Sequence, residues 1–530
     1  MAPFTQIPDQ LKGHVCLLPD EGLLVAAKSL EGSPLLDTFF SRIRKEDKAY
    51  RHIDFRPSVV LEELLKKSSS HFECVETDSD AQNTLRKVFE RAASERASDV
   101  HFILGNSCCE IKFRIDGDLG PYSEISCEAG RNILVALLQS VSGDQSHSSW
   151  SDTESQSARI KKGEFLPNNV HAIRVQKVPH TNGQYAVARL LYDNSEKGNI
   201  RDRLLKLGYS DDHVCSIEFL VRHPHGTIIL GGGTGHGKST TLKNLMEAMA
   251  ESIPQRNYFT VEDPPEYPIK GAIQRDASNT ADGFATAIVE ALRLDPDVLM
   301  VGEIRDERSA YATVRAAQSG HLVLSTIHAN TATNILTRFA DLLDGAGIGD
   351  SRALLSDVSV LSGLVSQRLV KKICPHCSIP LDKFPKEKRT PELNSVLSRI
   401  RVLVANTEPY KSTIRIHNPK GCDHCRAGHF GRTVVAEVIV LDADFQKAYR
   451  EQGIEQARHY WLHQQDKQEA GTIRNSKSMA GHAVQLILQG KIDPVEAEKS
   501  LGFLNFDAMF DDGKISSEEI KSATGYEDTL

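Results

Sequence analysis

The feature that most constrains the fold is the glycine-rich stretch at residues 228–242, where Gly232, Gly237, Lys238 and Ser239 satisfy the pattern Gly-x-x-x-x-Gly-Lys-Ser. An apolar run precedes this stretch and an amphipathic helical pattern follows it, as a phosphate-binding loop requires. Glycines let successive N–H groups turn toward one phosphate, and the helix adds its own unpaired N–H groups. The alternative is a glycine-rich turn that binds nothing, but a lysine and a serine both in register favour the phosphate loop.

In such a loop, backbone and side-chain groups together hold a nucleotide. We expect Lys238 at the β- and γ-phosphates of ATP and the Ser239 hydroxyl on Mg²⁺. The expected nucleotide-binding residues are Gly232, Gly233, Thr234, Gly235, His236, Gly237, Lys238, Ser239 and Thr240.

The length and net charge of the chain limit its possible domain organisation and partners. A chain of 530 residues has room for about three or four domains. The net charge of -8, from 63 basic and 71 acidic residues, gives no indication of a polyanionic partner, so we expect no nucleic acid. No apolar run approaches the roughly 18 residues that cross a bilayer, and the first residues do not resemble a signal peptide. We therefore expect a cytoplasmic protein.

The pattern of apolar residues divides the chain into six parts. Helical and strand-like patterns before the linker predict an α+β domain, with a mobile, Ser-rich loop at 142–158. After the linker, strand-length runs at 227–230, 258–261, 298–301 and 322–327 alternate with helices, which predicts a covered, mostly parallel sheet. The predicted parts are an N-terminal module of unknown role (1–75), the α+β domain (76–200), a linker (201–208), the α/β core (209–370), a cysteine-containing arm (371–435) and a helical C-terminal region (436–530).

Acidic residues follow two of the predicted core strands. Glu262 and Asp263 come directly after the run at 258–261, and Glu303 follows the run at 298–301. Carboxylates at the carboxyl ends of parallel strands, beside a phosphate loop, can hold Mg²⁺ or orient the water that attacks the γ-phosphate. Without the phosphate loop, each would be read as an acidic loop at the end of a strand.

His328 follows the predicted strand at 322–327, and a histidine at that edge could report whether the γ-phosphate is present. A lone histidine is more often structural, so this assignment depends on the neighbouring carboxylates.

Four of the ten cysteines form two Cys-x-x-Cys pairs, Cys374 with Cys377 and Cys422 with Cys425. In a cytosolic chain this spacing favours a metal over a disulfide, and four thiolates are the usual ligands of structural Zn²⁺. Free thiols and an iron–sulfur cluster are the alternatives.

Four ordered motifs resemble those of the secretion ATPase superfamily, the motors of type II secretion, type IV pilus and type IV secretion systems. They are the phosphate loop, Thr-x-Glu-Asp-Pro-x-Glu at 260–266, Gly-Glu-Ile-Arg-Asp at 302–306 and Ser-Thr-x-His-x-Asn at 325–330. The phosphate loop departs from the family pattern at Gly233, where proline is common, and at His236, where serine is common.

The resemblance implies a homohexamer of RecA-like cores with PAS-like N-terminal domains, a zinc arm and ATP bound between each core and a neighbouring N-terminal domain. Arg174 and Arg189 match the positions from which family members place arginines against the phosphates. An arginine there can neutralise charge that develops on the γ-phosphate.

The expected function is therefore a cytoplasmic ATPase, peripheral to the inner membrane, that powers assembly of a type IV pilus or type II secretion pseudopilus by acting on a membrane-embedded platform protein. In this interpretation Lys238, Glu262 and Glu303 serve ATP hydrolysis, Asp263 and Ser239 hold Mg²⁺, and His328 senses the γ-phosphate. The alternatives are a type IV secretion or conjugation motor, against which the cysteine pairs argue, and a RecA-type nucleic-acid motor.

Overall fold

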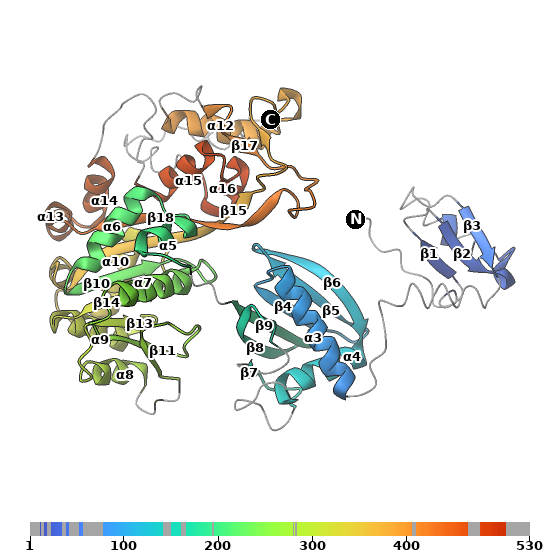
Figure 1. The fold of residues 1–530 in the computed structure, drawn as a ribbon, viewed down its shortest axis with the longest axis horizontal. Coiled ribbons are helices and arrows are strands. Elements are labelled where there is room, and N and C mark those ends of the chain that lie inside the picture. Colours follow the sequence, from blue (N-terminus) through green and yellow to red (C-terminus); the bar gives the residue numbers. More distant parts are fainter. Residues whose placement is uncertain are drawn as a thin grey trace. The chain divides into compact units, whose positions relative to one another are not determined.

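The computed structural model divides the chain into two compact units, Met1–Leu190 and Leu191–Leu530 (Figure 1), and each is described by itself below. The residues that the structure describes are 11, 15–18, 23–33, 36, 39–41, 52–56, 78–140, 150–160, 166–192, 196–278, 280, 283–404, 410–464 and 477–504.

The first sheet of the N-terminal unit lies in the predicted module 1–75. It contains β1 (Val15–Leu18), β2 (Leu23–Ala27) and β3 (His52–Arg56). β2 pairs antiparallel with β1 and parallel with β3, and a short helix, η3 (Lys28–Leu30), follows it. The sequence contained no readable motif here.

The second sheet of this unit has six strands in the order β6-β5-β4-β9-β8-β7. It is accompanied by α3 (Asp78–Ser94), α4 (Cys127–Val135) and the single π-helical turn η5 (Ala136–Ser140). The apolar residues that recur at helical spacing in α3, Leu85, Val88, Phe89, Ala92 and Ala93, are buried. The strands are β4 (Asp99–Leu104), β5 (Cys108–Ile115), β6 (Asp118–Ser126), β7 (Gln156–Ile160), β8 (Val170–His180) and β9 (Gly183–Tyr192).

The loop predicted at 142–158 is wrong from Gln156 onward, where β7 begins; residues 142–149 lie outside the described residues. Gln156 is buried in this strand, and the buried Lys177 Nζ donates to its Oε1 at 3.1 Å. The same ammonium lies 4.4 Å from the ring centroid of Trp150, and the Trp150 indole N–H donates to Asp152 at 2.8 Å. The composition of this stretch suggested a loop because it is rich in polar residues. Hydrogen-bond partners such as Lys177 come from elsewhere in the folded unit, which the local sequence does not show.

The second unit is built on a seven-stranded sheet in the order β12-β11-β13-β14-β10-β15-β18, parallel except for the last pair. All four predicted core strands are present, as β10 (Gly226–Gly231), β11 (Tyr258–Glu262), β13 (Val298–Val301) and β14 (Leu322–Ile327). The other strands are β12 (Ile273–Asp276), β15 (Leu361–Ile373) and β18 (His429–Val440). The α/β fold class predicted from the sequence is confirmed.

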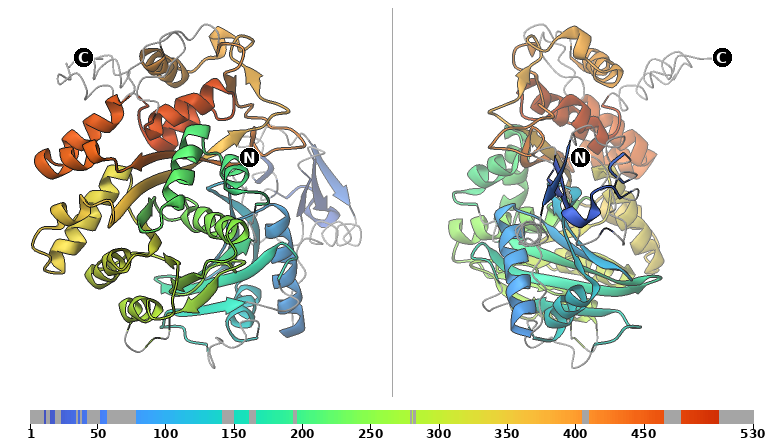
Figure 2. Two further views of the ribbon diagram at one scale, coloured as in Figure 1. Left: turned by 60° about the vertical axis from the view of Figure 1, so that its left-hand side comes forward. Right: turned by 90° about the vertical axis from the view of Figure 1, so that its right-hand side faces the viewer.

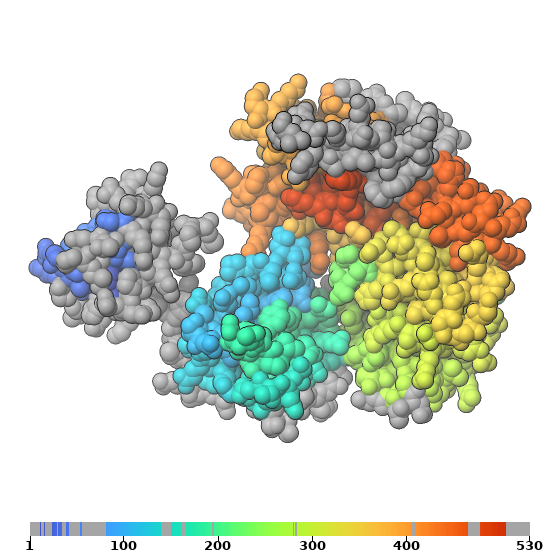
Figure 3. Space-filling view, turned by 180° about the vertical axis from the view of Figure 1, so that it is seen from behind, coloured from blue at the N-terminus to red at the C-terminus, as the bar shows by residue number. Residues whose placement is uncertain are grey.

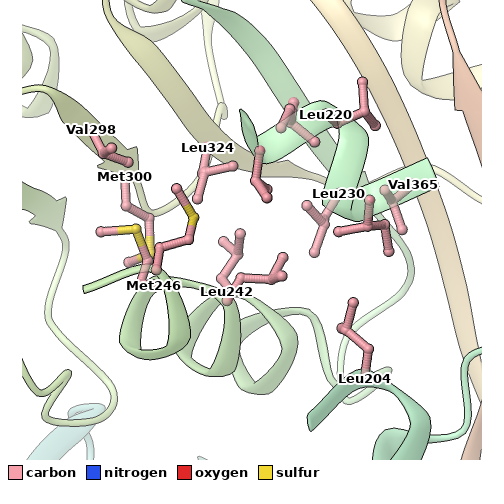
Figure 4. Close-up of a cluster of buried hydrophobic side chains, with 14 of the residues drawn as sticks. Leu204, Leu220, Leu230, Leu242, Met246, Val298, Met300, Leu324 and Val365 are labelled. Atoms are coloured by element: carbon pink, nitrogen blue, oxygen red, sulfur yellow. The ribbon is translucent and has the colours of Figure 1, made fainter. Parts of the chain in front are cut away.

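Helices cover both faces of this sheet. One face packs against α5 (Ile200–Leu207), α6 (Asp211–Arg222) and α7 (Lys238–Ser252), which Figure 1 shows grouped together. Figure 4 shows this core, in which Leu242 and Met246 of α7 point toward strand residues such as Leu324. The helices of the other face are α8 (Phe284–Ala291), α9 (Glu307–Gln318), α10 (Ala332–Gly345), α11 (Ser351–Leu355), α13 (Ala443–Gln452) and α14 (Ile454–His463). In Figure 3 the orange α13 and α14 lie against the yellow α10 and α11.

The long antiparallel pair β15 and β18 carries the cysteine-containing arm between its strands. The arm holds β16 (Ile379–Pro380), the short helix η7 (Lys386–Lys388), α12 (Pro391–Leu403) and β17 (Arg415–Ile416). Figures 1 and 2 show α15 (Met479–Leu488) and α16 (Pro494–Leu501) between the sheet and α12. Of the predicted helical region 436–530, residues 465–476 and 505–530 lie outside the described residues. In the part of the chain that is described, no helix is both long and apolar enough to cross a membrane.

Candidate active site

The phosphate loop connects β10 to α7 and takes its shape from its glycines. Gly232, Gly235 and Gly237 have positive φ angles of 154°, 77° and 81°, which residues with a Cβ rarely adopt. A Cβ on Gly232 would also lie 2.7 Å from the carbonyl oxygen of Gln367. Lys238 folds back over the loop, since its Nζ donates to the carbonyls of Gly232 at 2.7 Å and Gly233 at 3.1 Å. These bonds fix the ammonium beside the backbone of the loop.

The first turn of α7 offers its backbone N–H groups to an anion. The helix begins with Gly237 as N-cap, and no side chain caps it. Unpaired N–H groups and the positive end of the helix dipole favour a phosphate at such a terminus. The exposed Ser239 lies in this turn. These residues fit the triphosphate and the metal ion expected from the sequence.

The parallel strands bring the predicted acidic residues and His328 to the edge where the phosphate loop begins. β13 lies between β11 and β14, and β14 pairs with β10 with Gly231 opposite Ile327. Glu262 ends β11, Glu303 follows β13 and His328 follows β14. Four stretches that are far apart in sequence therefore end side by side.

Glu262 is a buried carboxyl group, 9% exposed, and its neighbours fix its orientation. Its Oε1 accepts hydrogen bonds from Thr260 Oγ1 at 2.8 Å and from Gln274 Nε2 at 2.9 Å. Burial raises the pKa of Glu262, and the charge of Glu266 acts in the same direction, while the two donors oppose the rise. A carboxyl group with a raised pKa is suited to proton transfer near neutral pH.

Glu303 is held on both carboxylate oxygens. His328 Nε2 lies 2.9 Å from its Oε1, and Arg305 Nε donates to its Oε2 at 3.0 Å. The same guanidinium reaches Asp263 Oδ2 at 2.9 Å, so Arg305 bridges the predicted catalytic Glu303 and the predicted magnesium ligand Asp263. The structure thus brings Asp263, Glu303 and His328 into one polar network.

Lys238 belongs to the same electrostatic neighbourhood. Burial lowers the pKa of its ammonium, and the charges of Glu303 and Glu266 act to raise it. The phosphate loop and the carboxylates at the strand ends therefore form one site, with a cation on one side and acids on the other.

The two arginines predicted to contact phosphate lie on the sheet of the N-terminal unit. Arg174 is an exposed residue of β8, and Arg189 of β9 donates from Nε to Asp99 Oδ1 at 2.8 Å. Both belong to the other unit of the chain from the phosphate loop, so their contact with a nucleotide stays a prediction.

The four cysteines of the arm come together where β15 ends and β18 begins. All four sulfur atoms lie within 4.8 Å of one another, with separations of 3.7 Å for Cys374 and Cys422 and 3.5 Å for Cys377 and Cys425. A tetrahedral zinc site with Zn–S bonds of about 2.3 Å has sulfur–sulfur edges of about 3.8 Å. The cluster therefore has the donor set and spacing of a closed, structural four-thiolate site.

Sequence reasoning missed three residues that shape this site: Gln274, Arg305 and Gln367. Gln274 orients Glu262, Arg305 joins Glu303 to Asp263, and Gln367 donates from Nε2 to the carbonyl of His236 at 2.8 Å. Arg305 belongs to the motif Gly-Glu-Ile-Arg-Asp, in which only Glu303 carries a role predicted from the sequence. The two glutamines offered no signal, because their roles depend on strand neighbours that are distant in sequence.

Comparison with known proteins gives a consistent result. Residues 75–490 match the family described as "Type II/IV secretion system protein". Over 418 residues the chain is 32% identical to the putative type II secretion system protein E of Escherichia coli K12, covering 78% of each chain. It is 30% identical over 373 residues to the type IV pilus assembly ATPase PilB of Thermus thermophilus, which covers 70% of this chain and 38% of that protein.

The fold is also found among solved structures. The ATPase DotB of Legionella pneumophila superposes with a TM-score of 0.54 at 17% identity, covering 78% of this chain and 94% of that one. At this level of identity the similarity concerns the fold alone.

Proposed function

Because this chain belongs to the family of type II/IV secretion system proteins and is an ATP hydrolase, we propose that it powers assembly of a type IV pilus or a type II secretion pseudopilus. The observation that carries the motor function is the meeting of the phosphate loop with Glu262, Glu303 and His328 at one edge of the sheet.

ATP would bind with its phosphates in the hollow of the loop. Lys238 and the N–H groups at the start of α7 offset the phosphate charge, and Ser239 and Asp263 would hold Mg²⁺. The metal supplies further charge neutralisation when bound. For Asp263 to do this, Arg305 would have to release it, since the two are now paired at 2.9 Å.

Glu303 would orient the attacking water, with Glu262 supporting the proton transfer. The contacts of Arg305 and His328 with the two oxygens of Glu303 keep its carboxylate in one orientation, which suits it to position a water in line with the γ-phosphate. His328, 2.9 Å from Glu303, would transmit whether that phosphate is present. Burial of Glu262 keeps its pKa closer to neutral, so that it can accept a proton.

The hexamer, the arginine contacts and the membrane partner belong to the same proposal. Arg174 and Arg189 would act on the phosphates bound to a neighbouring subunit, so that hydrolysis is coupled to domain movement. That movement would do work on a platform protein at the inner membrane, with the ATPase on the cytoplasmic side.

The cysteine cluster favours a motor of pilus assembly or type II secretion over a type IV secretion or conjugation motor. Zn²⁺ held by Cys374, Cys377, Cys422 and Cys425 would be structural, since four protein ligands leave no open coordination position. It would fix the end of the β15–β18 pair, from which the arm extends.

The central experiment replaces Glu303 with glutamine, which keeps its size and removes its charge. We expect Glu303→Gln to bind ATP within a few-fold of the unchanged chain and to lose about 10²- to 10⁴-fold in kcat. Glu455→Gln, which makes the same change at an exposed residue of α14, is the matched control and should keep full activity. Undiminished turnover by Glu303→Gln would remove Glu303 from the mechanism.

A second experiment separates the possible machines. Lys238→Ala in the native host should abolish surface pili or the secretion of a protein substrate, and which of the two is lost identifies the system. Loss of DNA transfer or effector delivery, with pili and secreted protein unchanged, would instead support a type IV secretion or conjugation motor.

A further inference from the structure

His236 lies in the middle of the phosphate loop, but its imidazole turns back onto the loop. Its Nδ1 accepts a hydrogen bond from the backbone N–H of Gly233 at 3.0 Å. The bond joins two residues three positions apart and so closes a ring within the loop. It requires a neutral imidazole with its proton on Nε2, because a protonated Nδ1 cannot accept.

The imidazole of His236 also leaves little room for a side chain at position 233. A Cβ at Gly233 would lie 3.1 Å from His236 Cε1 and 3.3 Å from Nδ1, closer than ordinary van der Waals contact. Gly233 is not among the residues with positive φ, so the backbone would accept alanine there. The imidazole therefore disfavours any side chain at position 233, and the N–H of Gly233 gives the imidazole its partner.

Gln367 supports this ring from the neighbouring strand β15. The side chain of Gln367 is completely buried, and its Nε2 donates to the His236 carbonyl at 2.8 Å. Its Oε1 accepts from Thr241 Oγ1 of α7 at 3.0 Å and from the buried Tyr209 hydroxyl at 2.5 Å. Since both of its polar atoms are engaged, the amide has one orientation, and His236 is held at its backbone and its ring.

We propose that His236 is a positioning residue for ATP, which with Gly233 forms a matched pair that holds the phosphate loop in its anion-binding shape. The pair deepens the function proposed above, since it concerns the same ATP site. A preformed loop does not have to be ordered when the phosphates bind, so the pair raises affinity without touching the reacting atoms.

The charges around the imidazole favour its neutral form. Burial lowers the pKa of His236, and the positive charges of Arg368 on β15, Lys238 on α7 and Arg432 on β18 lower it further. A hydrogen bond with the backbone of Gln367 acts in the opposite direction. ATP affinity should therefore be constant above the ordinary pKa of histidine and fall at acid pH, once His236 is protonated and the bond to Gly233 is lost.

The test measures the dissociation constant of ATP, kcat and KM for variants of the full chain. His236→Ala removes the acceptor, and we expect about two- to tenfold weaker ATP binding, as for the loss of one hydrogen bond, with little change in kcat. His236→Asn places an amide oxygen at the position of Nδ1 and should restore most of this affinity. It should also remove the fall in affinity at acid pH, because the amide does not titrate.

The steric part is tested by a double-variant cycle. Gly233→Ala should weaken ATP binding when His236 is present and have a much smaller effect in the His236→Ala background. Thermal unfolding and circular dichroism of each variant show whether it is folded. Additive effects at the two positions, or an unchanged ATP affinity in folded His236→Ala, would overturn the proposal.

Lys238→Ala separates this inference from the function on which it rests. If Lys238→Ala binds ATP as well as the unchanged chain, the nucleotide site itself is wrong. If Lys238→Ala loses ATP and His236→Ala does not, the site stands and only the matched pair is refuted.

Discussion

Lowering the pH from 7 to 5 should weaken the packing of α6 against α15, because each helix buries a histidine at their contact. His213 and His482 are 6% and 1% exposed, and their rings meet edge to face with centroids 4.6 Å apart. His482 Nδ1 accepts from the Ala436 N–H at 3.0 Å, whereas His213 Nδ1 and His482 Nε2 have no hydrogen-bond partner among the described residues. A proton added to either ring would be a buried charge without a counter-ion.

The size of the effect follows from the pKa of His213, which burial lowers from 6.5 to about 4. Above pH 6.5 the ring is neutral in both the folded and the unfolded chain, and stability does not depend on it. Below pH 6.5 the unfolded chain binds a proton that the folded chain does not, so stability falls as the pH drops toward 4. At pH 5 this linkage amounts to about 2 kcal/mol in the free energy of unfolding. Burial also lowers the pKa of His482 well below its ordinary value, which acts in the same direction.

Trp461 can report unfolding of this unit, since it is 4% exposed and belongs to the same unit as both histidines. The chain has two tryptophans, so a Trp150→Phe background leaves Trp461 as the only one. Urea unfolding of this variant, with and without His213→Leu, would be measured from pH 7.5 to pH 5. Other groups titrate equally in both proteins, so the two stability curves should diverge by about 2 kcal/mol at pH 5. Parallel curves would refute the reasoning that His213 is buried and neutral.

Three further predictions concern the motor unit and the arm. Arg203→Met should cost about 3–5 kcal/mol in the same unfolding assay, because it removes the guanidinium that lies 3.0 Å from Oε2 of Glu247, whose side chain is 1% exposed. Adding Glu247→Leu should recover part of that loss, and a double variant as unstable as the single one would contradict the explanation. Gln274→Leu removes a donor that favours the charged form of Glu262, so the pKa of Glu262 should rise and the acid limb of the pH profile of kcat should move to higher pH; an unchanged profile would count against Glu262 in catalysis. Cys425→Ser should reduce bound zinc, measured by atomic emission, from about one ion per chain toward zero and lower the melting temperature. The zinc proposal would be refuted if the protein without substitutions, prepared in the absence of chelators, contained no zinc.

The elements that periodicity predicts best are those that are buried over their whole length. The apolar runs at 298–301 and 322–327 coincide with β13 and β14, since a parallel strand covered on both faces is apolar throughout. β12 was missed because Ile273–Asp276 lies at the edge of the sheet, largely exposed, with only one apolar residue in four. Strand β7 was missed because its first residue, Gln156, is a buried polar residue, whose partner Lys177 is supplied by β8.

In the site, residue type and spacing predict the candidate catalytic and metal-binding groups but not the residues that hold them. Lys238, Glu303 and the four cysteines stand in local patterns whose function follows from residue type and spacing. Gln274 and Gln367 are single glutamines whose partners lie in other elements. Their roles follow from strand order and register, which a sequence pattern does not contain.

The segment that leads into the motor core is attached to the phosphate-binding helix at several points, and these attachments limit how it can move. The Glu196 N–H donates to Asn244 Oδ1 at 2.8 Å, and Asn244 Nδ2 donates to the Thr240 carbonyl in the first turn of α7 at 2.9 Å. Helix α5 begins four residues after Glu196 and packs against α7. After its end, the Tyr209 hydroxyl donates to the Gln367 amide that supports the phosphate loop. A shift of residues 196–209 against α7 would break these bonds in a buried setting, where unpaired polar groups are costly. The segment and the phosphate loop should therefore move as one body, so that force applied to the segment reaches the ATP site directly.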